Sequence, residues 1–497
     1  MKINQIKYGA ILSYALIIVN ALYGLLMAPY ILSQIGEGDY GVYKTIAAFS
    51  STLTVLDLGI GTTVMRYTAK FRAERKTEEI SNFAAMGLIE AGVMALIVSF
   101  VCAAVYSYLP TFYAAIFTAR EITLARLLFL ILSINTVLVI FENVLHGVIT
   151  GTDHFVFANA TKLVLLILRI VAAVSFLQRW KSAVVLVMLA LGISVLNLIC
   201  QLLFIRFGLK IRIRLKRWEP CLFKESLGYT AAMFVQTLAF QANGNIDHIV
   251  ISRVVGPVAV AVYSIAMQLF NMFESLSMAF SNLMLPTVAR QISEGADDRA
   301  IQQTVTKVGR MQFMVLGAAL TGFLFVGRDF VSLWLGEGYE DVYYLALILM
   351  VPSTLTLIQN VCLSVLRARN MMRFRTLCLV FGLIFNIVFT IIGTRVFGYY
   401  AAAVGTALTI LLAYGVAMNA YYHKRIGFRI FRFYADVFRR LLVCLMIPGV
   451  ILWLLGYFAD GSWLWLSIRI GVFIAVYAGL LWFYGLSEQE KNYICQK

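Results

Sequence analysis

The chain has 497 residues, of which 61% are hydrophobic and only 13% are charged, and its mean hydropathy is +0.85. Because a soluble domain carries about 25% charged residues, this composition indicates a protein that crosses a membrane many times. The formal net charge of +16 comes from basic residues in short loops between apolar segments, so membrane topology explains it and nucleic-acid binding is not expected.

Apolar segments of about 20 residues, long enough to cross a bilayer, recur along the whole chain. The expected fold is therefore an all-α polytopic membrane protein with about fourteen transmembrane helices. The first segment follows MKINQIKYGA without a small-residue cleavage site, so we expect a retained helix rather than a signal peptide. The predicted spans cover residues 8–32, 40–66, 80–108, 124–149, 155–178, 182–206, 229–252, 257–287, 304–327, 342–366, 374–394, 399–422, 438–458 and 464–485.

The loops between these spans alternate in charge. One set is rich in Lys and Arg, whereas the opposite set is nearly free of them and includes the acidic stretch GRDFVSLWLGEGYED. The positive-inside rule then predicts that the basic loops and both termini are cytoplasmic, with the loop GTDHF as an exception that has no basic residue. The basic loops contain Lys70, Arg72, Arg75 and Lys76; Lys210, Arg212, Arg214, Lys216 and Arg217; Arg367, Arg369, Arg373 and Arg375; and Lys424, Arg425, Arg429 and Arg432.

Two of the basic loops, residues 207–228 and 423–437, have the pattern of basic amphipathic surface helices. Trp218, Phe428 and Phe431 are the expected interfacial anchors. An orientation signal with anchoring is favoured over a lipid-docking role for these loops.

The chain also contains a weak internal repeat. Gly36 and Tyr43 in GEGDYGVY match Gly256 and Tyr263 at a shift of 220 residues, and ENVLHGV matches QNVCLSV at a shift of 217. The shift encloses six predicted spans, so both halves have the same orientation, which is a known transporter plan. We predict a six-helix lobe (1–206), a basic linker (207–228), a second six-helix lobe (229–422), a second basic linker (423–437) and two additional helices with a tail (438–497).

The seven cysteines form neither a CxxC pair nor a metal-ligand spacing, so no metal site and no disulfide framework are expected. Membrane enzymes that polymerise or ligate sugars usually need a large extracytoplasmic loop. No predicted outer loop exceeds about twenty residues by the span-length criterion, so no catalytic residue and no enzyme activity are predicted.

Four motifs resemble those of one family of exporters. They are GEGDYGVY, the second-span stretch LDLGIGTTVMRY, the turn GVITGTDHF, and the seventh-span stretch NGNIDHIVISRVVG. With them, nearly the whole chain resembles the polysaccharide-transport flippases of the multidrug/oligosaccharidyl-lipid/polysaccharide exporter superfamily. His248 departs from the family pattern, which has Lys or Arg at this position.

The resemblance implies a V-shaped pair of six-helix lobes around a central hydrophilic cavity. It also implies that the cargo is an oligosaccharide linked to undecaprenyl diphosphate, moved from the inner to the outer leaflet of the bacterial cytoplasmic membrane by alternating access. Membrane lipids and glycan-assembly proteins are the other expected partners. A drug or small-metabolite exporter of the same superfamily and a peptidoglycan-precursor flippase stay open as alternatives, and a membrane-embedded glycan polymerase or ligase is a remote one.

Moving a diphosphate through hydrocarbon requires cations, and Arg169, about halfway along the fifth span, is the strongest candidate. The alternative is an ion pair with Glu90 or Glu142 that only holds the first lobe together. Arg66 is a second candidate, either for the diphosphate or for snorkelling to headgroups.

Four other cations lie closer to the predicted ends of spans. Lys44 is a third candidate for the diphosphate, although snorkelling is the favoured role for it and for Lys162. Arg126 and Arg469 are expected to snorkel as well.

Amide side chains cluster on the seventh predicted span, and their density is too high for a lipid-facing surface. Sugar contact is the expected role of Gln236, Gln241, Asn243 and Asn245, and Asp247 lies on the same half-helix.

Acidic residues deep in apolar spans mark functional sites and suit proton or sodium coupling, so H⁺ or Na⁺ is the only expected coupling species and no organic cofactor is expected. For Asp57 the alternative is a backbone hydrogen bond at the LGIG turn. Gly59 and Gly61 beside it predict a hinge or a close helix contact. The candidates for ion coupling or cavity lining are Asp57, Glu90, Glu142, Asp247, His248 and Glu274.

Overall fold

The computed structural model describes residues 2–54, 59–218, 220, 241, 244–294, 297–369, 371–458, 460–486, 488 and 490–491. Within these residues the regular elements are all helices, which confirms the predicted all-α class. Twelve of the described helices are long and apolar enough to cross a membrane. The second predicted span forms two shorter helices, and most of the predicted span 229–252 lies outside the described residues, so the count is compatible with fourteen.

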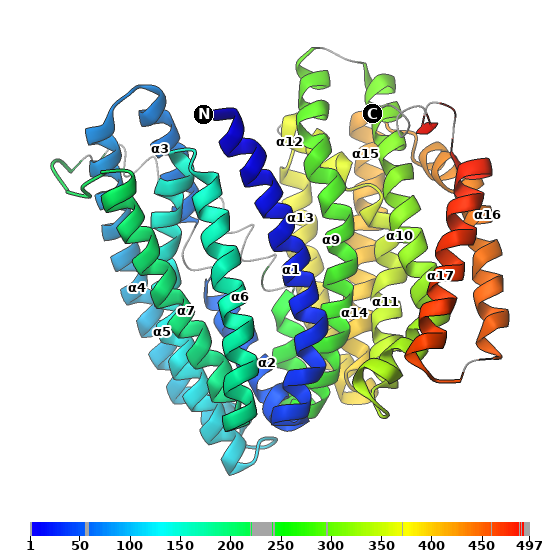
Figure 1. The fold of residues 1–497 in the computed structure, drawn as a ribbon, viewed down its shortest axis with the longest axis horizontal. Helices are drawn as coiled ribbons and strands as arrows, with labels where there is room; N and C mark the ends of the chain where they lie inside the picture. The colour runs from blue at the N-terminus through cyan, green and yellow to red at the C-terminus, as the bar shows by residue number, and fades with distance from the viewer. Residues whose placement is uncertain are drawn as a thin grey trace. The chain divides into compact units, whose positions relative to one another are not determined.

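The chain divides into two compact units, Met1–Ala261 and Val262–Lys497. The boundaries predicted for lobes and linkers stay a prediction. The first unit contains α1 (Lys2–Ile35), α2 (Glu37–Leu53), α3 (Ile60–Ala73), α4 (Thr77–Tyr113), α5 (Ala119–Gly151), α6 (Phe155–Trp180), α7 (Ala183–Leu203), the π-helical turn η2 (Phe204–Gly208) and a helical segment over residues 244–254 (Figure 1).

The second unit contains most of α9 (Pro257–Ser293), whose start falls in the first unit. It continues with α10 (Asp298–Leu335), α11 (Glu340–Leu357), α12 (Val361–Ala368), α13 (Arg373–Phe397), α14 (Tyr400–Thr409), η3 (Ile410–Ala417), α15 (Met418–Ile426), α16 (Ile430–Gly456), α17 (Trp463–Leu480) and η4 (Leu481–Gly485).

Helix α5 lies at the centre of the first unit and packs against α2, α3, α4, α6 and α7. A capping box at Thr118 and Glu121 starts it, and this arrangement satisfies backbone N–H groups that the helix leaves unpaired. Its contact with α3 is close because glycines line both helices. A Cβ atom on Gly147 would lie 2.4 Å from the carbonyl oxygen of Gly61, and one on Gly61 would lie 2.6 Å from that of Asn143.

The repeated motif starts a helix in both of its copies. Gly36 precedes α2 with φ 80°, and Gly256 precedes α9 with φ 121°. A residue with a Cβ is strained in this region of backbone space, so both positions require glycine. The repeats nevertheless differ in where a helix is interrupted. The second predicted span is split into α2 and α3, whereas in the second unit the interruption lies between α11 and α12, at residues 358–360.

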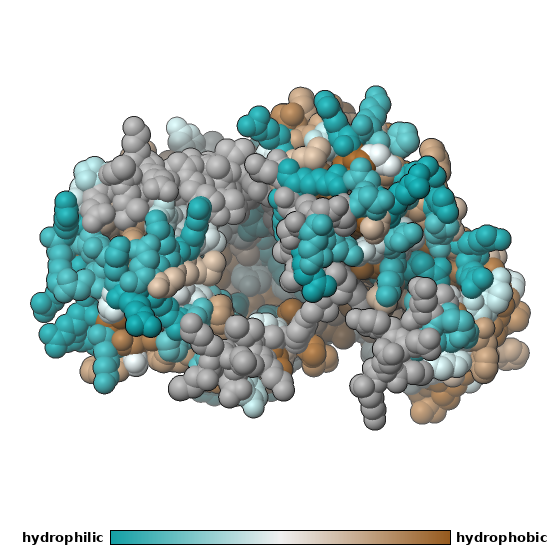
Figure 2. Space-filling view, turned by 90° about the horizontal axis from the view of Figure 1, so that it is seen from above, coloured by the Kyte–Doolittle hydropathy of each residue, from teal (hydrophilic) through white to brown (hydrophobic). Residues whose placement is uncertain are grey.

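Basic loops gather at one end of the first unit, the top in Figure 1, where α3 ends and α4 begins. The loop GTDHF, the exception in the charge pattern, lies at this end as well, and its Asp153 forms a salt bridge of 2.8 Å with Arg72. The acid is therefore held by the same basic loop that carries the topology signal. Figure 2, which views the molecule from this end, shows hydrophilic side chains gathered over the first unit.

Of the two predicted surface helices, the second is largely helical, because residues 423–426 belong to α15 and residues 430–437 to α16, whereas residues 209–218 of the first are not helical. Residues 209–218 have no helix, because Asn82 of α4 takes the place of a helical hydrogen-bond ladder. Its Oδ1 accepts from the backbone N–H groups of Lys216 at 2.8 Å and Arg217 at 3.0 Å, and its Nδ2 donates to the carbonyl of Arg217 at 2.7 Å. In the second loop only residues 427–429 separate α15 from α16. Phe428 is buried there, whereas Phe431 is 92% exposed.

Arg469 does not snorkel, so that expectation was wrong. Its side chain is buried in the second unit, where its guanidinium forms a salt bridge with Asp329 of α10 and donates to the carbonyls of Phe325 at 3.0 Å and Leu452 at 3.3 Å. One buried cation thus joins α10, α16 and α17 beside an apolar core.

Replacing Arg469 with leucine is expected to destabilise the protein by about 2–3 kcal/mol, because breaking a buried pair leaves a charge without its partner and Asp329 is partly exposed. The measurement is the apparent melting temperature of the purified protein in detergent. Arg328→Leu is the matched control, since the bridge from Arg328 to Glu340 is exposed on both sides and such bridges contribute about 0–1 kcal/mol. Equal shifts for the two variants would contradict the structural role of Arg469.

Candidate substrate-binding site

Two cations of the first unit approach each other among aromatic rings. The Arg169 guanidinium of α6 lies 5.9 Å from the centre of the Tyr23 ring of α1, and Lys44 Nζ of α2 lies 5.2 Å from that of the Tyr40 ring. Both charges act on the hydroxyl of Tyr43. Residues of α1, α2 and α6 therefore meet at one place, and Lys44 is half-buried among them.

The helical segment 244–254 runs antiparallel to α2 at this place. His248 lies within electrostatic range of Lys44, and Gln241 Nε2 donates to the carbonyl of Ser51 at 3.4 Å. Lys44 and Ser51 are seven residues apart on α2, and their partners His248 and Gln241 are seven residues apart on the segment, which is about two helical turns in each case. Asn245, between them on the segment, donates to the carbonyl of Gln241 at 2.9 Å.

These residues form what we call the cation–amide cluster. It combines two cations, a phenol, an imidazole and two amides, which are the groups that bind phosphate oxygens and sugar hydroxyls. Its members are Lys44, Arg169, Tyr43, His248, Gln241 and Asn245.

A second polar group joins α5, α6 and α7 in the same unit. Glu142 Oε2 accepts from Asn197 Nδ2 at 2.6 Å, and Asn197 Oδ1 accepts from Gln201 Nε2 at 3.3 Å. Lys162 Nζ lies 3.2 Å from His146 Nε2 and interacts electrostatically with Glu142. We call this group the α5–α7 polar network.

This network bears on the alternative role that the sequence left open for Arg169. Glu142 balances its charge against Lys162, which lies seven residues before Arg169 on the same helix. Among the described residues Arg169 forms no salt bridge with Glu142 or with Glu90. A structural ion pair therefore does not account for this cation in the described part of the chain, which favours a ligand for it.

The other predicted site residues lie apart from the cluster or outside the described residues. Arg66 is exposed on α3, and Glu90 is buried on α4, where its Oε1 has no hydrogen-bond partner among the described residues. Asp247 is 1% exposed. Glu274 belongs to the second unit and acts on Tyr414 of η3. Three predicted residues lie outside the described residues, namely Asp57, Gln236 and Asn243.

The two glycines beside Asp57 have different structural roles. Gly59 is the N-cap of α3 in the left-handed conformation, at φ 71°, so glycine is required there by backbone geometry. Gly61 makes the close contact between α3 and α5. A hinge role for either residue stays a prediction.

Five residues of these groups were not predicted from the sequence as site residues, namely Tyr23, Tyr43, His146, Asn197 and Gln201. The four-residue spacings from Glu142 to His146 and from Asn197 to Gln201 were a usable signal, because such residues lie on one face of a helix. A polar pair repeated on one face of an apolar span predicts a partner on a neighbouring helix.

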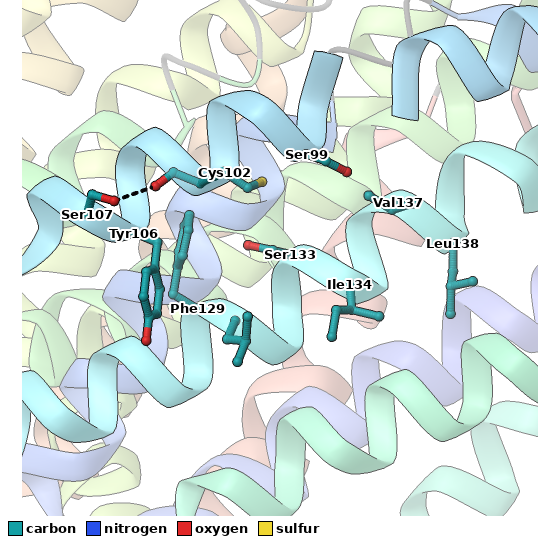
Figure 3. A pocket seen from close by; sticks show the side chains of 11 residues that line it. Ser99, Cys102, Tyr106, Ser107, Phe129, Ser133, Ile134, Val137 and Leu138 are labelled. Atoms are coloured by element: carbon teal, nitrogen blue, oxygen red, sulfur yellow. Dashed lines mark hydrogen bonds between the residues drawn. The ribbon is translucent and has the colours of Figure 1, made fainter. Parts of the chain in front are cut away.

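A cavity of 480 Å³ opens between α4 and α5 at a different place (Figure 3). Its lining is mainly apolar and contains the serines Ser99, Ser107 and Ser133, but no charged side chain among the described residues. A diphosphate needs cations, so the cation–amide cluster is the better candidate for the polar head of a substrate. In the described part of the chain no group of His, Cys, Asp and Glu is placed to hold a metal ion.

Comparison with protein families then places the chain. Residues 6–292 match the sequence model described as polysaccharide biosynthesis protein, which is more than half of the chain. The chain belongs to this polysaccharide biosynthesis protein family. Residues 232–392 also match the MatE family. The predicted membership of the multidrug/oligosaccharidyl-lipid/polysaccharide exporter superfamily is thereby confirmed, and this member of the family is a multi-pass membrane transporter.

Solved structures share the fold at low sequence identity. The lipid II flippase MurJ in an inward closed conformation is 14% identical with a TM-score of 0.72, and the match covers 95% of this chain and 97% of that one. An inward-facing multidrug resistance MATE family transporter is 14% identical with a TM-score of 0.67, covering 82% and 94%. A superfamily transporter from Pyrococcus furiosus is 15% identical with a TM-score of 0.54, covering 85% and 96%. No curated protein matches the chain.

Proposed function

We propose that this protein is a flippase for a lipid-linked oligosaccharide of the undecaprenyl diphosphate type, which it moves from the inner to the outer leaflet of the bacterial cytoplasmic membrane. The basic loops and both termini face the cytoplasm. The family match to polysaccharide biosynthesis supports the cargo class, and the cation–amide cluster is the observation that carries the proposal. Glycan-assembly proteins are its proposed partners.

The cluster fits the head of this cargo better than it fits an organic cation. A phosphate that leaves water loses solvation, and nearby cations must compensate for that loss. Arg169 offers paired N–H donors for phosphate oxygens, and Lys44 adds a second positive charge. The adjacent amides of Gln241 and Asn245 suit hydroxyl groups, so diphosphate and sugar contacts lie side by side.

We further propose that an ion gradient drives alternating access. A carboxylate within the membrane can exchange a proton or hold a sodium ion, and the α5–α7 polar network presents one, Glu142, beside the imidazole of His146. Asp57, Glu90, Asp247, His248 and Glu274 stay candidates for the same role.

A peptidoglycan-precursor flippase is the second candidate, favoured by the similarity in fold to the lipid II flippase MurJ over 95% of this chain. Both cargoes carry a polyprenyl diphosphate, so the cluster serves either one. Drug export is less well supported, because two cations repel a cationic drug.

The test uses the purified protein in liposomes that contain, in separate samples, a fluorescent lipid-linked oligosaccharide, fluorescent lipid II or a fluorescent organic cation. We expect the oligosaccharide lipid to move at least about tenfold faster than in liposomes without protein. This rate corresponds to a barrier that is lower by about 1.4 kcal/mol. Faster movement of lipid II would favour the second candidate. Transport of the organic cation alone would overturn the proposal.

A further inference from the structure

A polar cavity of 760 Å³ lies in the second unit where α10 and α16 begin. It shares no residue with the cation–amide cluster or the α5–α7 polar network. The described lining includes five cations from the first four turns of α10 and from the start of α16, which are Arg299, Lys307, Arg310, Arg429 and Arg432.

The cavity has a fixed floor. Arg310 donates to Glu490 at 3.0 and 3.3 Å, to the carbonyl of Asp436 at 3.0 Å and to that of Gly485 at 2.9 Å. The side chains of Arg310 and Glu490 are only 15% and 5% exposed, so these two charges neutralise each other.

One wall is fixed by a reciprocal pair of hydrogen bonds. Gln302 Nε2 donates to the carbonyl of Arg429 at 3.3 Å, and the Arg429 N–H donates to Gln302 Oε1 at 3.2 Å. This pair joins the start of α16 to α10 and fixes the backbone from which the Arg429 side chain extends.

The charge of the cavity calls for an anion. Apart from the Arg310–Glu490 pair, the described lining has four cations and one carboxylate, Asp436, which lies 3.8 Å from Arg432. Arg299, Lys307, Arg429 and Arg432 are all exposed. Several guanidinium groups around one cavity match a phosphate, whose oxygens accept paired N–H donors.

The position of the cavity points to a lipid as the source of that phosphate. Helix α10 has 38 residues and is about 57 Å long at 1.5 Å per residue, whereas the hydrocarbon core is about 30 Å thick. The helix is therefore longer than the core, and the charged residues near its start favour that end as the one at headgroup level. Phe431, between Arg429 and Arg432 in the sequence, is 92% exposed, as expected for a side chain that enters the lipid interface.

We propose that this cavity binds the phosphate-bearing headgroup of an anionic phospholipid of the inner leaflet. Arg429 and Arg432 bind the phosphate at the rim, Arg299 and Lys307 complete the positive surface from α10, and Phe431 contacts the acyl chains. The site is separate from the cargo site, so lipid binding there does not depend on which cargo the protein moves.

The test compares binding of phosphatidylglycerol and phosphatidylcholine to the full-length protein by native mass spectrometry. The wild-type protein is expected to retain phosphatidylglycerol at least about fivefold more than phosphatidylcholine, since juxtamembrane basic residues select anionic lipids. The double variant Arg429→Glu/Arg432→Glu is expected to lose this preference. Lys424→Glu/Arg425→Glu is the matched control, because it makes the same change in charge on exposed residues of α15 outside the cavity.

Equal loss of the lipid preference in both double variants, or no preference in the wild-type protein, would overturn the proposal. If glycerol phosphate or inorganic phosphate displaces the lipid at equal concentration, the ligand is a soluble phosphate and the lipid assignment fails. Should the glutamate variant fold poorly by size-exclusion chromatography, Arg429→Gln/Arg432→Gln and the single variant Lys307→Glu must reproduce the loss.

Discussion

Replacing Arg169 with glutamate is expected to abolish transport of the lipid-linked oligosaccharide while leaving the amount of folded protein in the membrane unchanged. Because no described carboxylate forms a salt bridge with Arg169, its removal leaves no buried acid without a partner. The new carboxylate instead faces the phosphates of the cargo beside Lys44. Losing a buried charge contact costs 2–5 kcal/mol, so we expect a decrease in transport rate of about thirtyfold or more.

The measurement is the liposome assay with the lipid-linked oligosaccharide, together with size-exclusion chromatography of the variant. Arg169→Lys keeps the charge but not the paired donors, and it is expected to have intermediate activity. Arg179→Glu changes an exposed residue in the last turn of the same helix and should transport normally. Unchanged transport by Arg169→Glu would remove Arg169 from the cargo site, and a loss of folded protein would assign it a structural role.

Replacing Gly147 with leucine is expected to destabilise the first unit strongly, because it forces apart the closely packed helices α3 and α5. Its Cβ would lie 2.4 Å from the Gly61 carbonyl oxygen and 3.1 Å from the Met65 backbone nitrogen. Backbone atoms cannot rotate away as a side chain can, so α3 and α5 must separate. Overpacking of this kind costs about 1–3 kcal/mol or more, and we expect the upper end, with a melting temperature lower by about 6–10 °C.

Gly92→Ala on α4 provides the control for this prediction, because a Cβ at Gly92 meets no heavy atom within 4 Å. Alanine in a helix interior is favoured over glycine by about 1 kcal/mol, so this variant should be as stable as the wild-type protein or more stable. A melting temperature for Gly147→Leu equal to that of Gly92→Ala would show that α3 and α5 are not packed as described.

The sequence was sufficient for the helical class, the spans and the charge asymmetry of the loops, because each depends on local composition. It also identified Arg169, Lys44, Gln241, Asn245 and His248 as polar residues in apolar surroundings. What it could not supply was the rotation of each helix about its axis, and rotation decides which polar side chains meet.

Lys44 and Arg469 both illustrate this limit. Both are single cations in apolar segments, and snorkelling was the favoured interpretation of each. Lys44 instead lies half-buried near His248 of the distant segment 244–254, and Arg469 is buried against Asp329, 140 residues earlier in the chain. Neither partner is marked by spacing, since each comes from a distant helix. Residues 209–218 are not helical for a related reason, because Asn82 on α4 provides hydrogen bonds that amphipathicity does not reveal.

The unequal interruptions of the two repeats have a mechanical consequence. A helix that stops and restarts bends more readily than a continuous one. The break lies in the second span of the first unit, where Gly59 starts α3, but in the fourth span of the second unit. The counterparts of these broken spans, α9 and α5, are continuous helices. The two units therefore carry their breaks at positions that do not correspond, so we expect each unit to bend at a different span during transport.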